Sequence, residues 1–286
     1  MQHTNRPFLG LLGILAALTG TSVPVRAVTA ITVCNPAVSA PAGSKLDKPG
    51  NYVVTADLTA GSGDCILITS ADVSLKLNGH TITPGTSGGN DAIHVDGTVN
   101  LVQHVAIEGP GLITNTPTTG FANGIEFATV NFSQVDLVTI VGALSNGIAV
   151  NGGCNYLTIG SNVITRSFIG IEIFTSNFVV ISGNDASGNS QGIEFDDRSY
   201  SPTVNNNIVN GNSIGIEVQD PVHFARIYSN VIDGNRDYGI EAFGAGNQYS
   251  NNRVLGNGSD IGGVPCGNFW SGNTFQKATS CTPPIN

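Results

Sequence analysis

Short segments that alternate apolar and polar residues recur along the chain at a nearly constant step. Each copy starts with Gly-Ile, and a glutamate follows in five of the six copies. Alternation with a period of two is typical of a half-buried β-strand. A constant step indicates one supersecondary unit that is stacked many times. The copies begin at Gly124, Gly147, Gly170, Gly192, Gly215 and Gly239, at steps of 23, 23, 22, 23 and 24 residues.

Inward and outward positions follow from this alternation. The isoleucine of each copy and the residue two positions later, such as Ile125 and Phe127, are expected to point into the core. The glycine before the isoleucine is expected to allow a tight bend into the strand.

Two columns of asparagine keep the same register. Asparagine tolerates bent backbone, and its amide both donates and accepts hydrogen bonds, so we expect these residues at the corners between strands. The columns are Asn162, Asn184, Asn207, Asn230, Asn252 and Asn273, and Asn189, Asn212, Asn235 and Asn257.

The Gly-Ile-Glu strands, the asparagine corners and the opening stretch from Pro49 to Thr83 resemble the right-handed parallel β-helix family, the pectin lyase-like fold of secreted bacterial proteins. The resemblance implies an all-β, single-stranded right-handed parallel β-helix of about 11 coils of roughly 23 residues. It implies little about activity, because the family includes lyases, hydrolases, epimerases and non-catalytic surface proteins.

The first thirty residues are predicted to be a signal peptide. A short apolar run extends from Phe8 to Leu18, and small residues follow at Ala27 and Ala30, so cleavage after either alanine fits. An uncleaved anchor is the alternative. Residues 31–286 are then one secreted domain, extracellular or periplasmic, with no membrane span after cleavage.

The charge balance excludes some partners. The chain has 11 basic and 20 acidic residues, a net charge of −9, and loss of Arg6 and Arg26 with the leader changes this to 9 − 20 = −11. The long-range field repels phosphate groups, so nucleic acid is not expected as a partner.

Five cysteines bear on the ends of the domain. An exported chain can oxidise them, and we expect the pairs Cys34–Cys65 and Cys266–Cys281 to staple the two ends. Cys154 is left over, and we interpret it as a small buried residue rather than a nucleophile.

The glutamates in the middle of the strands are expected to form a row, with neighbouring carboxylates about 5 Å apart. Protonation of alternate members, bound Ca²⁺ or side chains that splay into solvent would relieve the repulsion. His94 occupies the same column in an earlier coil and would extend it. The candidate Ca²⁺ ladder is Glu172, Glu194, Glu217 and Glu241.

A second group of polar residues gathers where two successive strands end. Counting from each glutamate places Asp197 over Asp220, and Tyr200 over His223. Two carboxylates can divide acid and base roles on a sugar, a histidine or tyrosine can move a proton, and arginine can stabilise charge. A solvated cluster on a turn is the alternative. The candidate catalytic residues are Asp196, Asp197, Arg198, Tyr200, Asp220 and His223.

Two functions fit these observations. The first is contact with extracellular polysaccharide, as a polyuronate lyase, hydrolase or C5-epimerase, with Ca²⁺ as the one cofactor suggested. The second is a non-catalytic cell-surface, scaffold or adhesion β-helix. The sequence contains one Trp and six Tyr, which is few for stacking on sugars.

Overall fold

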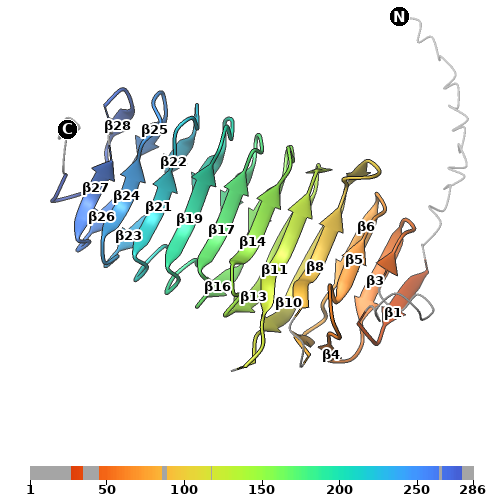
Figure 1. The fold of residues 1–286 in the computed structure, drawn as a ribbon. Helices are drawn as coiled ribbons and strands as arrows, with labels where there is room; N and C mark the ends of the chain where they lie inside the picture. Colours follow the sequence, from red (N-terminus) through yellow and green to blue (C-terminus); the bar gives the residue numbers. More distant parts are fainter. Residues whose placement is uncertain (1–26, 35–44, 86–88, 117, 264–265, 279–286) are drawn as a thin grey trace, which may run out of the picture.

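The computed structural model describes residues 27–34, 45–85, 89–116, 118–263 and 266–278. In these ranges the chain winds into coils that stack along one axis, with β1 (Val28–Ile31) near one end and β28 (Phe269–Ser271) near the other (Figure 1). All strand pairs are parallel and join successive coils, so the predicted β-solenoid is confirmed. The ten-stranded sheet gives about ten coils.

This ten-stranded sheet carries the Gly-Ile-Glu copies. Its strands, in spatial order, are β2 (Lys45–Leu46), β5 (Ile66–Ile68), β8 (Gly89–Asp96), β11 (Phe121–Ala128), β14 (Asn146–Asn151), β17 (Ile169–Phe174), β19 (Gln191–Asp196), β21 (Ile214–Val218), β24 (Tyr238–Ala242) and β27 (Ser259–Gly263).

A second sheet of 14 strands covers the other side of the core. It contains β1, β3 (Gly50–Val54), β4 (Leu58–Thr59), β6 (Val73–Lys76), β7 (Thr81–Thr83), β10 (Ala106–Thr114), β13 (Gln134–Val141), β15 (Thr158–Gly160), β16 (Val163–Thr165), β18 (Val180–Ser182), β20 (Thr203–Asn205), β22 (Arg226–Tyr228), β25 (Gln248–Ser250) and β28. Two further pairs are β9 (Val102–Gln103) with β12 (Val130–Asn131), and β23 (Val231–Asp233) with β26 (Arg253–Leu255).

Apolar columns fill the space between the sheets. Ile125, Phe127 and their equivalents in the later coils are fully buried, which confirms the inward positions expected from the sequence. Each column continues from coil to coil, so the core is one cluster along the whole rod.

The glycines of the repeat have a different role from the expected one. They lie inside the strands, and their φ angles are not in the left-handed region, so no bend requires them. A Cβ on Gly170 would lie 2.5 Å from the carbonyl oxygen of Gly192, and one on Gly147 would lie 2.6 Å from that of Gly170. The column is glycine because successive coils approach too closely for a side chain.

Both asparagine columns form buried ladders at the corners. In the first, Asn207 Oδ1 accepts from the backbone N–H and the side-chain amide of Asn184, at 2.8 and 3.0 Å. The second ends on Asp260, whose Oδ1 accepts from the amide of Asn257 at 3.0 Å. The expected corner role of asparagine is therefore confirmed, and the ladders satisfy polar backbone groups that would otherwise be buried without partners.

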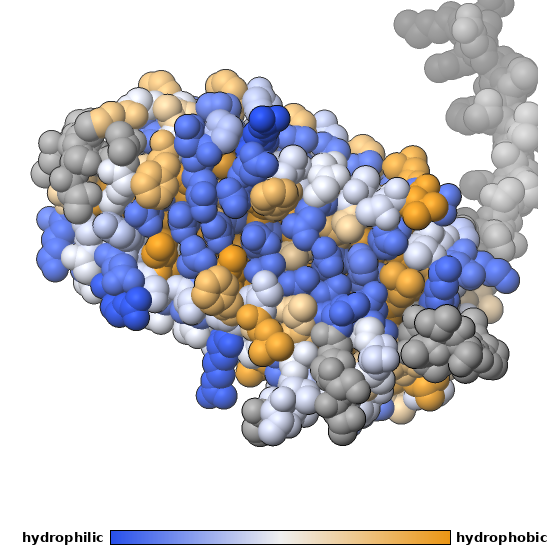
Figure 2. All heavy atoms as spheres, in the orientation of Figure 1, coloured by the Kyte–Doolittle hydropathy of each residue, from blue (hydrophilic) through white to orange (hydrophobic). Residues whose placement is uncertain are grey.

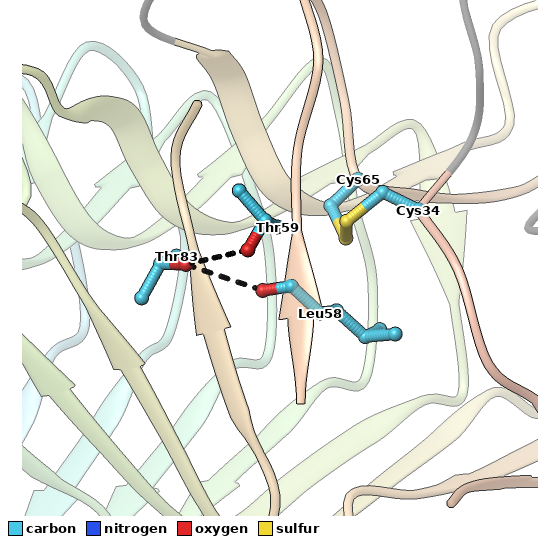
Figure 3. Close-up of a disulfide and its surroundings, with 5 residues drawn as sticks. All are labelled: Cys34, Leu58, Thr59, Cys65 and Thr83. Carbon is cyan, nitrogen blue, oxygen red and sulfur yellow. Dashed lines mark hydrogen bonds between the residues drawn. A yellow bond between two sulfur atoms is a disulfide. The ribbon is translucent and has the colours of Figure 1, made fainter. Parts of the chain in front are cut away.

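A disulfide joins Cys34 to Cys65 and staples the first coils, as expected (Figure 3). Beside it, Thr83 donates to the carbonyl oxygen of Leu58 at 3.3 Å. At the other end Cys266 is disulfide-bonded, but its expected partner, Cys281, lies outside the described residues. Cys154 is a free, fully buried thiol whose pKa is raised by burial, which fits a structural residue.

Most of the predicted signal peptide, residues 1–26, also lies outside the described residues. Val28–Ile31, however, form β1 and pair with β3. Within the described part of the chain, no helix is long and apolar enough to cross a bilayer.

Candidate functional site

The outer face of the ten-stranded sheet is dominated by polar side chains (Figure 2). In its glutamate column, strand pairing places His94 of β8 between Leu67 of β5 and Glu126 of β11. Three residues earlier in each of these two strands, Asp91 pairs with Asn123. Polar groups from successive coils therefore meet above β8 and β11.

Four of these groups form the His94 cluster, which comprises Asp64, Asp91, His94 and Glu126. His94 Nδ1 lies 3.0 Å from Asp64 Oδ2 and 3.8 Å from Asp91 Oδ2. On the other side of the ring, Nε2 lies 4.0 Å from Glu126 Oε2 and is buried without a hydrogen-bond partner in the structure. The imidazole thus lies between carboxylates from three coils.

The cluster holds protons more tightly than isolated groups would. Burial raises the pKa of Asp91 to about 8, and a hydrogen bond with Glu126 and the charges of Glu126 and Asp64 act in the same direction. Burial lowers the pKa of His94, but the hydrogen bond and charge of Asp64, with the neighbouring carboxylates, outweigh this and raise it. These interactions favour a protonated Asp91 at neutral pH, with the proton shared toward Glu126.

Exposure divides the cluster into two layers. The side chains of His94 and Glu126 are 22% and 20% exposed, whereas that of Asp91 is only 5% exposed. A bound molecule can thus reach the Glu126 side chain, whereas Nε2 of His94 is buried, and Asp64 and Asp91 hold these two side chains in place. An imidazole oriented by a carboxylate, beside a second carboxylate, is suited to general acid–base chemistry.

The same groups fit a divalent cation. Ligand atoms of Asp64, Asp91 and His94 all lie within 4.8 Å of one another, and no other such group occurs among the described residues. Carboxylate and imidazole ligands suit several transition metals, whose binding would compete with the protons.

Farther along the same sheet, the predicted glutamate row is present in register. Glu172 pairs with Glu194, Glu194 with Glu217, and Glu217 with Glu241. The carboxylates do not all splay into solvent, since Glu194 and Glu217 are only 6% and 8% exposed.

Amides from adjacent coils bind three of these carboxylates. Asn146 donates to Glu172 at 2.7 Å, Gln219 donates to Glu194 at 2.7 Å, and Gln191 donates to Glu217. Burial and the charge of Glu217 nevertheless raise the pKa of Glu194 to about 7. Burial also raises the pKa values of Glu172, Glu217 and Glu241. Proton uptake and amide donors both lessen repulsion along the row.

The second predicted group lies on exposed turns beyond β19 and β21. Tyr200 does pair with His223, as the count from the glutamates predicts. Arg198 Nε lies 3.9 Å from Asp197 Oδ1, and these two side chains are 81% and 50% exposed. Asp220 and His223 are also exposed, and Asp196 ends β19 in a half-buried position. Within the described part of the chain, no hydrogen bond or ion pair joins the side chains of Asp197 and Asp220.

An exposed aromatic ladder lies along one flank of the rod and includes Tyr200. Phe132 and Tyr156 are stacked at 5.0 Å, and Tyr156 and Phe178 at 4.9 Å. Tyr200 continues the ladder with edge-on contacts to Phe178 and Phe224. The stacked faces cover one another, so this ladder stabilises the coils and leaves few ring faces for sugars.

Sequence reasoning included His94 but missed Asp64, Asp91 and the role of Glu126. A signal was present, since Asp64-Cys-Ile-Leu and Asp91-Ala-Ile-His place an aspartate at the same distance before the inward isoleucine. The long loops between the early coils hide this register.

Three comparisons place the chain among known proteins. The family model described as a right-handed β-helix region matches residues 123–279, more than half of the chain, and the protein belongs to this family. A search of curated proteins found no match.

Solved structures share the fold at low sequence identity. The A-module of the mannuronan C-5 epimerase AlgE6 of Azotobacter vinelandii aligns over 90% of both chains, with 14% identity and a TM-score of 0.54. DFA-IIIase of Arthrobacter chlorophenolicus A6 in complex with DFA-III covers 79% of this chain and 66% of its own, with 14% identity and a TM-score of 0.61. XylC with xylose covers 68% of this chain at 15% identity and a TM-score of 0.55, and the alignment spans 37% of XylC. These similarities show the fold alone.

Proposed function

We propose that this protein acts on an extracellular polysaccharide, with Glu126 as the group that exchanges protons with the sugar and His94 as its buried partner. The observation that carries the proposal is the imidazole held between carboxylates from three coils, on the polar face of a solenoid. A long parallel face suits a linear polymer, and lyases, hydrolases and epimerases all require positioned acid and base groups. The similarity to sugar-related β-helix structures supports a carbohydrate substrate.

The roles follow from contact and exposure. Asp64 is a positioning residue that fixes the ring of His94 through Nδ1. Asp91 is a second positioning residue, because its proton bonds to Glu126 and its side chain is almost completely buried. Glu126 then offers its carboxylate to the glycosidic oxygen or to a ring carbon that bears an acidic proton. The buried Nε2 of His94, 4.0 Å from Glu126 Oε2, acts through that carboxylate.

A glycan panel tests the proposal. The purified protein is incubated with polyuronates and neutral polysaccharides, each with added Ca²⁺ or with a chelator. Reducing ends report hydrolysis, absorbance of unsaturated ends reports a lyase, and proton exchange with deuterated solvent at C5 reports epimerisation. Turnover of at least one polymer supports the proposal, whereas no product across the panel contradicts it. Loss of turnover in chelator would assign a cation to the site.

The exposed turn beyond β19 and β21 remains a second candidate, because Tyr200 and His223 are paired there as the sequence predicts. Its test is the variant Asp197→Asn with Asp220→Asn, whose turnover falls only if this turn is the catalytic site. Binding of Ca²⁺ by the glutamate row is a separate proposal. It is tested by calorimetric titration of the wild type and of Glu194→Gln with Ca²⁺. If the panel is silent, a non-catalytic surface protein becomes the better account.

Secretion is part of the proposal. Cleavage after Ala27 would leave β1 complete, whereas cleavage after Ala30 would remove three of its four residues. Amino-terminal sequencing of the exported protein should therefore begin at Val28.

A further inference from the structure

A groove of about 380 Å³ lies where the chain enters the strands of the ten-stranded sheet, and it extends from the coil of β17 to the coil of β24. Arginine stands at each end of it, at Arg166 and Arg236, and its lining between them consists of glycine, serine and asparagine. No acidic residue lines this groove, although the protein has a net charge of −9.

The floor of the groove is open because its column contains glycine. Arg166 occupies this column with a φ of 60°, and the equivalent residues of the next two coils, Gly188 and Gly211, have φ angles of 71° and 66°. A Cβ on Gly211 would meet nothing within 4 Å. The groove is thus a trough left by missing side chains, and it crosses about 14 Å, or three coil steps of about 4.8 Å.

Its polar groups have capacity for a ligand. Among the described residues, the Arg166 side chain makes no hydrogen bond or ion pair, and Arg236 pairs only with its neighbour Asp237, at 2.8 Å on the exposed surface. Ser167, which is 4% exposed, has a hydroxyl without a hydrogen-bond partner at the base of the groove. The exposed Ser190 and the adjacent Ser213 add hydroxyl groups.

We infer that this groove binds a carbohydrate that carries negative charge, with carboxylate or sulfate groups held by Arg166 and Arg236 and sugar hydroxyls held by the serines. The inference rests on the proposed function only in taking the ligand to be a glycan. Guanidinium groups bind carboxylate and sulfate through paired, charge-assisted hydrogen bonds, which gives affinity to an otherwise acidic surface. The groove borders the same sheet edge as Asp91, about three coils away, so one extended chain can occupy both sites.

Binding is measured by calorimetry with three probes, namely an oligogalacturonate of six residues, its methyl-esterified neutral form, and a sulfated oligosaccharide of similar length. Binding of an acidic probe at least tenfold tighter than of the neutral ester is expected, and which acidic probe binds identifies the anionic group. Arg166→Gln should weaken that binding at least tenfold. Gly211→Asn, which the left-handed φ tolerates, should do the same by filling the trough.

Arg226→Gln is the matched control, because Arg226 is an exposed arginine on the opposite sheet, in β22, and should leave affinity unchanged. Equal affinity for the acidic and neutral probes, or wild-type affinity in both groove variants, would overturn the inference. Repeating the titration with Glu126→Gln separates the two proposals. If the wild type binds the acidic probe but turns over no polymer, the inference about the groove is retained and the proposed catalysis is rejected.

Discussion

His94 of β8 donates through Nδ1 to Asp64 Oδ2 at 3.0 Å, across 30 positions of sequence, and Asp64 lies just before the adjacent strand β5. The chain contains a second pair with almost the same geometry, His104 and Asp72, whose atoms lie 3.1 Å apart. The side chains of the second pair are each 54% exposed, against 22% and 16% for His94 and Asp64. Burial and the nearby Asp91 and Glu126 distinguish the first pair as a candidate site, and the second provides its natural control.

The pH dependence of turnover should show an alkaline limb near pH 8. As pH rises through the pKa of Asp91, which is about 8, Asp91 loses the proton that it shares with Glu126, and a second negative charge appears beside that carboxylate. We expect the rate to fall over this range. Initial rates at pH 5 to 10 measure the limb, with enzyme stability confirmed at each pH.

Asp91→Asn tests the origin of that limb. Asparagine keeps a neutral donor toward Glu126 but has no proton to lose, so the variant should remain active and the limb should move to higher pH. An unchanged limb in this variant would mean that another group sets it.

Glu194→Gln should stabilise the protein at alkaline pH. The folded state holds the Glu194 proton up to a pKa of about 7, whereas an unfolded glutamate releases it near its ordinary value of 4.5. The free energy of unfolding of the wild type therefore falls as pH rises through this window, and the penalty is complete above it. Glutamine avoids the penalty and should be more stable by about 1 kcal/mol or more at pH 8, since each pKa unit is worth about 1.4 kcal/mol.

Denaturant unfolding at pH 4 and pH 8 checks this prediction. At pH 4, Glu194 is largely protonated in both the folded and the unfolded state of the wild type, so the two proteins should have similar stability. A variant that is less stable than the wild type at pH 8 would show that the ionised carboxylate is satisfied in the fold.

Asn207→Ala should destabilise the rod by about 2–3 kcal/mol, because it leaves buried donors and acceptors of both neighbouring coils without partners. Asn207 accepts twice from Asn184 and donates to Asn230. Asn100→Ala, at an exposed position, is the control. Chemical denaturation measures both, and equal stability of the two variants would refute a structural role for the ladder.

Tyr156→Ala should also destabilise the protein, by about 1–2 kcal/mol, because the ring stacks on both Phe132 and Phe178. Phe168→Ala removes a ring that is similarly exposed, at 56% against 51%, and that stacks on no other ring among the described residues. Thermal unfolding should show the larger shift for Tyr156→Ala. A larger shift for Phe168→Ala would indicate that the exposed stack contributes little.

The repeat predicts the fold because stacked coils convert sequence period directly into spatial register. Ile171 over Ile193, Glu172 over Glu194 and Tyr200 over His223 all follow from counting. The His94 cluster was harder to predict, since coils with long loops separate Asp64 from Asp91 and Asp91 from Asn123 by unequal steps. Counting also does not reveal burial, so the amide partners of the glutamates and the high pKa of Asp91 required the structure. The role of Gly170 and its equivalents was predicted wrongly. The repeat shows that glycine recurs once per coil, but it does not reveal that the close approach of successive coils is the reason.

Turnover in Glu126→Gln, compared with the wild type and with His104→Gln, tests the central claim most directly. With a polymer that the wild type processes, the Glu126→Gln rate should fall at least about 100-fold, as expected for loss of an acid–base group. His104→Gln, which breaks the exposed histidine–aspartate pair, should retain the wild-type rate. A Glu126→Gln protein that is folded, with an unchanged circular dichroism spectrum, and fully active would contradict the account.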